Sequence, residues 1–190
     1  MFLITTTNQR FIYKQTYNVD RQTPDSAATA TALFSGIKTN YYTLGYDSKV
    51  RVGSAKSMKT AKQLTSILDW GQSAGKRTGR DTKYSMMQYF TMGKLIYQFE
   101  IDIEILGIVT TARLTHATPA ALYAHSPHRY WECDAGLKRD EGYGSDNLIA
   151  PGEENPNYND TLDIARQLIY DETGEKANVL LGGGLRSFKA

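Results

Sequence analysis

The sequence predicts an α/β fold with a largely parallel central sheet. Candidate strands and helices alternate along the chain, which is the order that builds such a sheet. The chain has 190 residues, of which 41% are hydrophobic and 22% charged, as expected for a soluble globular chain of one domain. In such folds the functional side chains gather at the carboxyl ends of the strands.

The first unit is a strand, a turn and a helix. We expect a strand over residues 16–19, a turn at Thr23-Pro24 and a helix over residues 25–34. Gly36 follows at the position where a helix usually stops. The helix consists largely of alanine and threonine, so it is narrow and can approach a sheet closely.

The second unit is a helix followed by a strand. Apolar residues at three- and four-residue spacing predict a helix over residues 58–74, with Gly75 as its stop. The best following strand, at residues 108–111, comes much later than a helix-to-strand loop normally allows. Between them, residues 97–105 alternate between apolar and polar side chains, a pattern typical of a half-buried or edge strand.

The third unit follows a polar loop over residues 136–159. Asp160, with Asp163 three residues later, resembles a helix N-cap with its capping-box partner. Residues 178–181 then predict a short buried strand that runs into three glycines. The apolar face of the helix would comprise Leu162, Ala165, Leu168 and Ile169.

Charge and motifs exclude several function classes. The formal net charge of +2 is too small to indicate binding of nucleic acid or of an anionic membrane. The single cysteine, Cys133, leaves no internal disulfide and no paired-cysteine metal or redox motif. The sequence contains neither a G-x-x-x-x-G-K-[ST] nucleotide loop nor a G-x-S-x-G esterase elbow.

Ser26 lies where the first helix should begin. Backbone N–H groups point outward at a helix N-terminus and favour an anion there, so a serine oxygen in this position could attack phosphorus while the amides hold its other oxygens. The alternative is that Asp25 or Ser26 merely caps the helix, and spacing alone favours this alternative.

Two further segments carry candidate side chains. His116 and Thr118 follow the strand at residues 108–111, where they could face a metal or its bound water. The alternative is a histidine with ordinary partners and a turn-forming Thr-Pro pair. Arg129 could bind phosphate through its two-pronged guanidinium, although an isolated arginine is normally a surface residue.

Taken together, four blocks in the same order resemble animal alkaline phosphatases. The resemblance covers about residues 15–79 and 107–187; residues 1–14 remain unaligned. Residues 80–106 form an insert whose removal restores a short helix-to-strand connection, so we interpret it as a translated intron or splicing error, with a genuine insertion as the alternative. The blocks are residues 16–20 with 24–32, residues 109–125, residues 129–134, and residues 163–168 through to 182–184.

The resemblance implies an incomplete three-layer α/β/α sandwich and a role for each candidate residue. Ser26 corresponds to the serine that becomes phosphorylated beside one of two zinc ions, and Arg129 to the arginine that holds two phosphate oxygens. Asp25 would orient Arg129. Thr118 matches a hydroxyl ligand of one magnesium ion, and His116 would lie next to that ion.

The resemblance also implies a homodimeric enzyme that hydrolyses phosphate monoesters, located outside the cell or at its surface on a lipid (GPI) anchor. We recognise no signal peptide, transmembrane segment or anchor signal in the chain, and we expect no nucleic-acid partner. Asn159 begins a sequon for N-glycosylation.

The metal ligands are where the chain departs from the family. The first metal-binding aspartate would fall near residues 1–14, and the remaining zinc ligands and the magnesium glutamate beyond Ala190. Since the chain holds only three histidines, we expect it to be inactive alone. The alternative function is therefore a catalytically inactive fragment that acts only as an interaction or dimerisation module.

Overall fold

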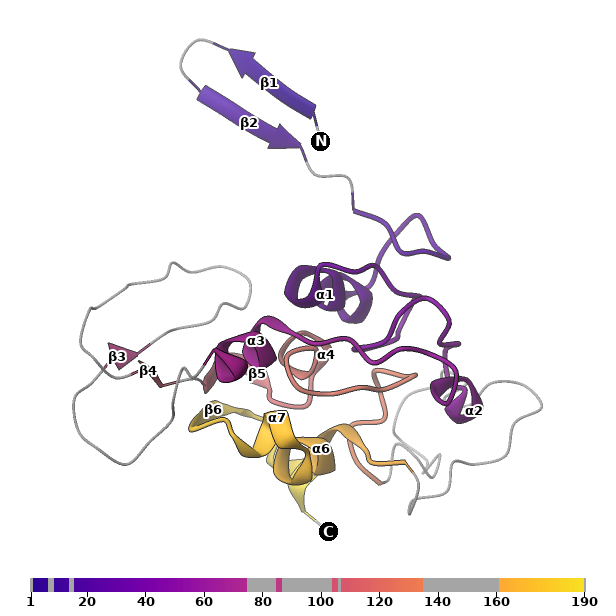
Figure 1. Cartoon of the computed structure of the whole chain (residues 1–190), viewed down its shortest axis with the longest axis vertical. Coiled ribbons are helices and arrows are strands. Elements are labelled where there is room, and N and C mark those ends of the chain that lie inside the picture. The colour runs from indigo at the N-terminus through magenta and orange to yellow at the C-terminus, as the bar shows by residue number, and fades with distance from the viewer. Residues whose placement is uncertain are drawn as a thin grey trace.

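The computed structural model describes residues 16–74, 107–134 and 161–189, together with the backbone of four short strand segments. Figure 1 shows the order and arrangement of these elements. The elements are β1 (Phe2–Thr6), β2 (Gln9–Tyr13), α1 (Ser26–Ser35), α2 (Ala55–Met58), α3 (Ile67–Ser73), β3 (Ser85–Met86), β4 (Glu104–Ile105), β5 (Gly107–Arg113), α4 (Ala117–Ala120), α6 (Ile164–Tyr170), α7 (Glu172–Glu175), β6 (Val179–Gly183) and the 3-10 helix η1 (Leu185–Phe188).

β5 and β6 form a two-stranded sheet and run parallel. Their register places Gly107 opposite Val179. A side chain on Gly107 would come within 2.3 Å of the Val179 carbonyl oxygen, so this strand pairing needs glycine. Parallel pairing of two strands that are separated by helices confirms the predicted α/β class.

Helix α1 confirms the prediction for residues 25–34. Asp25 is its N-cap, and Gly36 ends it in the left-handed conformation with φ of 75°. The predicted strand over residues 16–19 is wrong. There the backbone turns, because the Asn18 amide donates to the Arg21 carbonyl at 2.9 Å, and the segment joins residue 39 through one hydrogen bond instead of a ladder.

The single helix predicted over residues 58–74 is also wrong. The structure has two short helices, α2 and α3, separated by extended chain. The backbone of Leu64 donates to Gly45 at 2.8 Å, and Gln63 forms an isolated bridge with Tyr46, so these tertiary bonds replace helical ones. Ser66 then starts α3 with a capping box that includes Asp69. Helix α3 ends at Ser73, and Gly75 lies outside the described residues.

The third unit starts later than predicted. Asp163, not Asp160, is the N-cap of α6, and it accepts a hydrogen bond from the Arg166 amide at 2.7 Å. Asp160 lies outside the described residues. Ala165 and Leu168 are buried as predicted, whereas Leu162 precedes the helix and Ile169 is 49% exposed.

Strand β6 confirms the predicted strand but not its burial. Leu181 is 59% exposed, and no residue of the strand is fully buried. Within the described part of the chain, β6 pairs only with β5, so one of its edges and much of its surface have no cover.

Small side chains bring α1 against α4. Ala27 and Ala30 of α1 and Ala117 and Ala120 of α4 are all at most 3% exposed and belong to one core cluster. Figure 1 shows α1 and α4 next to each other, with β5 leading into α4. These small side chains let α1 lie close to helix α4, which brings the start of α1 toward the carboxyl end of β5.

Two further strand pairs are described by their backbone alone. β1 and β2 form an antiparallel hairpin in the segment that the sequence analysis left unaligned. β3 and β4 pair in parallel inside the predicted insert. Of the strand predicted over residues 97–105, only Glu104–Ile105 is described, and residues 97–103 lie outside the described residues. None of the helices that the structure describes is long and apolar enough to span a bilayer.

Candidate active site

Asp25 and Ser26 lie at the N-terminal end of α1. The Asp25 carboxylate caps the helix by accepting hydrogen bonds from the amides of Ala27 at 2.9 Å and Ala28 at 3.3 Å. The capping role that spacing favoured is therefore observed for Asp25. We expected amides at the start of this helix to hold phosphate oxygens. The amides of Ala27 and Ala28 do not meet that expectation, because both donate to Asp25.

Arg129 comes from a loop far along the chain and reaches both residues. Its Nη1 donates to Ser26 Oγ at 2.7 Å and to Asp25 Oδ2 at 3.2 Å. The side chains of this ion pair are largely withdrawn from water, at 11% exposure for Arg129 and 5% for Asp25. A guanidinium this close to the serine oxygen stabilises negative charge on that oxygen.

His116 contacts the other side of the guanidinium. Its Nε2 lies 3.3 Å from Arg129 Nη2. Since a guanidinium only donates, Nε2 must accept, and the imidazole is neutral with its proton on Nδ1. Burial lowers the pKa of His116, and the nearby charges of Arg129 and Arg113 lower it further, which agrees with a neutral ring.

Aromatic rings enclose Arg129. Its Cζ atom lies 5.6 Å from the ring centre of Tyr42 and 5.3 Å from that of Tyr130. Among the described residues, its Nε is buried and has no hydrogen-bond partner. The guanidinium is therefore held by its two Nη groups and by the rings, in surroundings that strengthen its interaction with an anion.

A second ion pair, partly buried, lies near His116. Glu132 is 1% exposed and accepts two hydrogen bonds from Arg113, at 2.9 Å and 2.7 Å, and one from Thr115 at 2.6 Å. Arg113 and Thr115 come from the end of β5 and the residues just before α4. This network fixes the chain that carries His116 to the segment that follows Arg129.

Of the two remaining predicted site residues, the described one, Thr118, does not join the Arg129 cluster. Thr118 lies half-buried in α4, and among the described residues the side-chain hydrogen bonds of Arg129 go to Asp25, Ser26 and His116 instead. Asn159 lies outside the described residues. The roles of all these residues stay predictions.

The implied metals are not matched by the described residues. No group of three or more histidine, cysteine, aspartate or glutamate side chains within residues 16–74, 107–134 and 161–189 is placed to hold a metal ion. Ser26 and Thr118 would supply at most two oxygen contacts, which is fewer than a zinc or magnesium site requires. These residues alone do not fit a metal, and we derive no chemical step through one.

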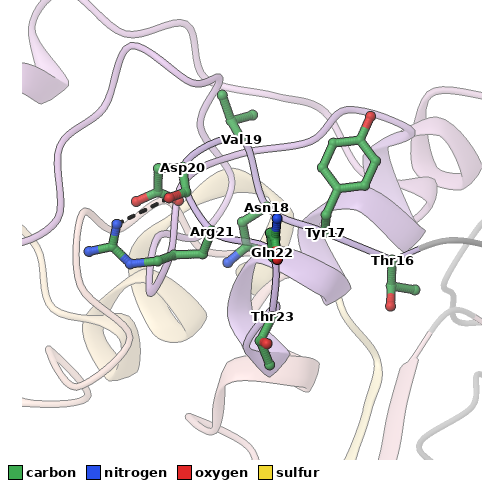
Figure 2. A pocket seen from close by; sticks show the side chains of 8 residues that line it. All are labelled: Thr16, Tyr17, Asn18, Val19, Asp20, Arg21, Gln22 and Thr23. Atoms are coloured by element: carbon green, nitrogen blue, oxygen red, sulfur yellow. Dashed lines mark hydrogen bonds between the residues drawn. The ribbon is translucent and has the colours of Figure 1, made fainter.

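A polar hollow of about 690 Å³ precedes the site. It is lined by the loop of residues 16–23, which leads into Asp25 and Ser26. Figure 2 shows the side chains of this loop, with the Arg21 side chain bound to the backbone of Asp20. The four clustered side chains do not line this hollow, so we assign the chemistry to the cluster and not to the hollow.

Sequence reasoning identified the four clustered residues but missed what surrounds them. Glu132 and Arg113 both fall in the blocks that resemble the family, yet nothing in their spacing indicates that they pair. Tyr42 belongs to none of those blocks. Only the three-dimensional structure shows that its ring and backbone touch the cluster.

Comparison with known proteins tests the predicted resemblance. The sequence matches the family model for alkaline phosphatase over residues 4–86 and 102–190. Residues 87–101, which the family model leaves unmatched, lie inside the predicted insert, whose origin stays a prediction. The match also reaches into residues 1–14.

Curated relatives agree with this family match. Alkaline phosphatase 4 of Drosophila melanogaster is 39% identical over 173 residues, covering 90% of this chain and 21% of that protein. The tissue-nonspecific isozyme of Gallus gallus is 34% identical over 170 residues, covering 90% and 24%. A membrane-bound alkaline phosphatase of Bombyx mori is 34% identical over 175 residues, covering 92% and 24%. The chain thus spans only 21% to 24% of the length of these relatives.

Solved structures are similar only loosely. Alkaline phosphatases from the Antarctic bacterium TAB5 and from a psychrophilic Shewanella align with TM-scores of 0.37 and 0.38 and identities of 24% and 26%. Each alignment covers 65% of this chain and 23% of the other, and TM-scores this low carry no weight. The match to the family model and the sequence identity to the relatives confirm the predicted resemblance and the incomplete α/β fold that it implies. The chain belongs to the alkaline phosphatase family.

Proposed function

We propose that this chain carries the phosphoryl-accepting part of a phosphate-monoester hydrolase, with Ser26 as the nucleophile. The observation that carries the proposal is the 2.7 Å hydrogen bond from Arg129 to Ser26 Oγ, which joins residues 103 positions apart. A serine oxygen beside a buried cation is suited to attack an anionic, tetrahedral phosphorus centre.

In the proposed reaction the Ser26 oxygen forms a bond to phosphorus as the bond to the ester oxygen breaks. The hydroxyl proton leaves Ser26, and the released alcohol takes up a proton. Water then splits the phosphoserine and releases inorganic phosphate. Arg129 holds the phosphate oxygens throughout, and Asp25 keeps the guanidinium in place through its buried ion pair.

Membership in the family implies metal cofactors in general, and we propose two zinc ions and one magnesium ion for the complete protein. Since the described residues do not hold a metal, we expect the 190-residue chain to bind phosphate without turning over esters. For the complete protein we also propose a homodimer at the cell surface on a lipid anchor, with Thr118 as a magnesium contact.

A chimera tests the proposed hydrolysis. It joins this chain to the remainder of the Drosophila relative and is made with and without residues 87–101, which the family model leaves unmatched. With zinc and magnesium at alkaline pH, we expect the chimera to release phosphate from p-nitrophenyl phosphate. Ser26→Ala should abolish release, whereas the control Ser35→Ala, on the same helix, should not. Turnover that survives Ser26→Ala would reject this nucleophile.

The second candidate function is an inactive fragment that acts as an interaction or dimerisation module. The exposed surface of β6 favours it, because Leu181 and the neighbouring Leu185 are 59% and 67% exposed. Calorimetric titration of the chain with zinc tests this second candidate. Tight binding of two zinc ions per chain would reject the inactive fragment.

A further inference from the structure

Tyr42 has an unusual backbone conformation. Among the described residues it is the one non-glycine residue with a positive φ, at 64°. It sits in a turn that the hydrogen bond from the Thr43 amide to the Asn40 carbonyl closes at 3.2 Å. Glycine or asparagine normally takes such a position, and an aromatic residue is disfavoured there. Strain of this kind persists where the surroundings hold it, and it often marks a functional site.

The strained backbone of Tyr42 joins the two partners of the buried ion pair. Its amide donates to Asp25 Oδ1 at 3.1 Å. Its carbonyl oxygen accepts from the Arg129 amide at 2.8 Å. One residue thus fixes the carboxylate and the backbone of the arginine relative to each other.

The ring of Tyr42 also forms part of the wall around Arg129. The guanidinium carbon lies 5.6 Å from the ring centre. Tyr41 stacks on this ring at 4.0 Å, and His128 and Tyr130 meet its edge at 5.5 Å and 5.8 Å. A ring packed by its neighbours is a fixed surface for the guanidinium.

We infer that Tyr42 is a positioning residue for the Arg129 guanidinium. A turn that required only a positive φ would be satisfied by glycine without strain. The strained tyrosine adds a ring that glycine lacks, and that ring lies against Arg129. The consequence for phosphate binding rests on the proposed function, whereas the positioning of Arg129 does not.

Two substitutions separate the ring from the backbone. Tyr42→Phe keeps both. Tyr42→Gly keeps the two backbone hydrogen bonds, because glycine adopts the left-handed conformation readily, but it removes the ring. Tyr170→Ala, which removes a 70% exposed ring on α6, is the control for loss of a tyrosine elsewhere.

The direct measurement is side-chain 15N NMR of Arg129 in the 190-residue chain, with the signals assigned by their loss in Arg129→Lys. We expect the wild type, Tyr42→Phe and Tyr170→Ala to show resolved Nη signals from a guanidinium that rotates slowly. Tyr42→Gly should average these signals in a chain that is still folded, since glycine accepts the positive φ and the loss is confined to the ring contacts. Resolved signals in Tyr42→Gly, or averaged signals in Tyr42→Phe, would overturn the inference.

Calorimetry with inorganic phosphate then connects positioning to function. We expect Tyr42→Gly to weaken phosphate affinity about fivefold, the loss of one cation–π contact, and Tyr42→Phe to leave it unchanged. If Arg129 is ordered in the wild type but phosphate does not bind, the proposed function fails and the positioning of Arg129 by Tyr42 stands. The two failures are therefore distinguishable.

Discussion

Removing the Asp25 carboxylate should destabilise the whole fold as well as the site. This carboxylate accepts four hydrogen bonds, from the amides of Ala27, Ala28 and Tyr42 and from the Arg129 guanidinium. Both members of the ion pair are nearly buried, so loss of one partner leaves the other charge uncompensated.

Two substitutions of Asp25 divide the cost. Asparagine keeps one oxygen, which can still accept from the amides of Ala28 and Tyr42, but its NH2 group takes the place of Oδ2. Asp25→Asn should therefore lose the ion pair and the bond from the Ala27 amide, at about 3 kcal/mol. Asp25→Ala also loses the rest of the cap, which adds about 1 kcal/mol. A total near 4 kcal/mol is a large part of the stability of an ordinary domain.

Urea unfolding of the chain measures these costs. Trp131 is 1% exposed and lies two residues after Arg129, so its fluorescence follows unfolding near the site. The matched control is Asp171→Ala, which removes the exposed cap of α7 and should cost about 1 kcal/mol or less. If Asp25→Asn costs no more than Asp171→Ala, the ion pair does not hold the site together.

Three other predictions use the same unfolding assay. The folded His116 has a lowered pKa, so the wild type should lose stability as pH falls below 6.5, and His116→Gln should lose less; equal losses would contradict a neutral buried ring. Burial raises the pKa of Asp163 from 3.8 to about 7, so its contribution to stability is fully present below pH 3.8 and is lost progressively as the pH rises to about 7. Asp163→Asn should lack that loss. Glu132→Gln removes the charged partner of Arg113, whose side chain is 33% exposed and can be solvated, so it should cost about 1 kcal/mol; no measurable cost would show that the pair is not structural.

Local signals in the sequence predicted the parts of the fold that depend on neighbouring residues. Helix α1 carries its own start and stop in Asp25 and Gly36, and both act as expected. The helix predicted over residues 58–74 failed because tertiary bonds from Gly45 and Tyr46 take the backbone of residues 63–64. Periodicity cannot reveal such competition, since the partners lie elsewhere in the chain.

In the site, too, the sequence predicted some features, and others depend on tertiary contacts that it does not reveal. Ser26 and Arg129 were identified through the resemblance, and the structure brings them within 2.7 Å. The sequence left open whether the first amides of α1 hold phosphate oxygens or are capped by a side chain. Only the geometry shows that Asp25 caps the amides of Ala27 and Ala28. Tyr42 gave no signal at all, because a strained backbone at a tyrosine leaves no pattern in composition or spacing.

The most direct test of the account is to trap the phosphorylated protein. The chimera is mixed with a phosphate monoester, quenched in acid and mapped by peptide mass spectrometry. We predict a phosphoryl group on Ser26, reduced in Arg129→Lys because a lysine cannot hold two oxygens in the same way. Turnover without phosphate on Ser26, or with phosphate on another residue, would contradict the account.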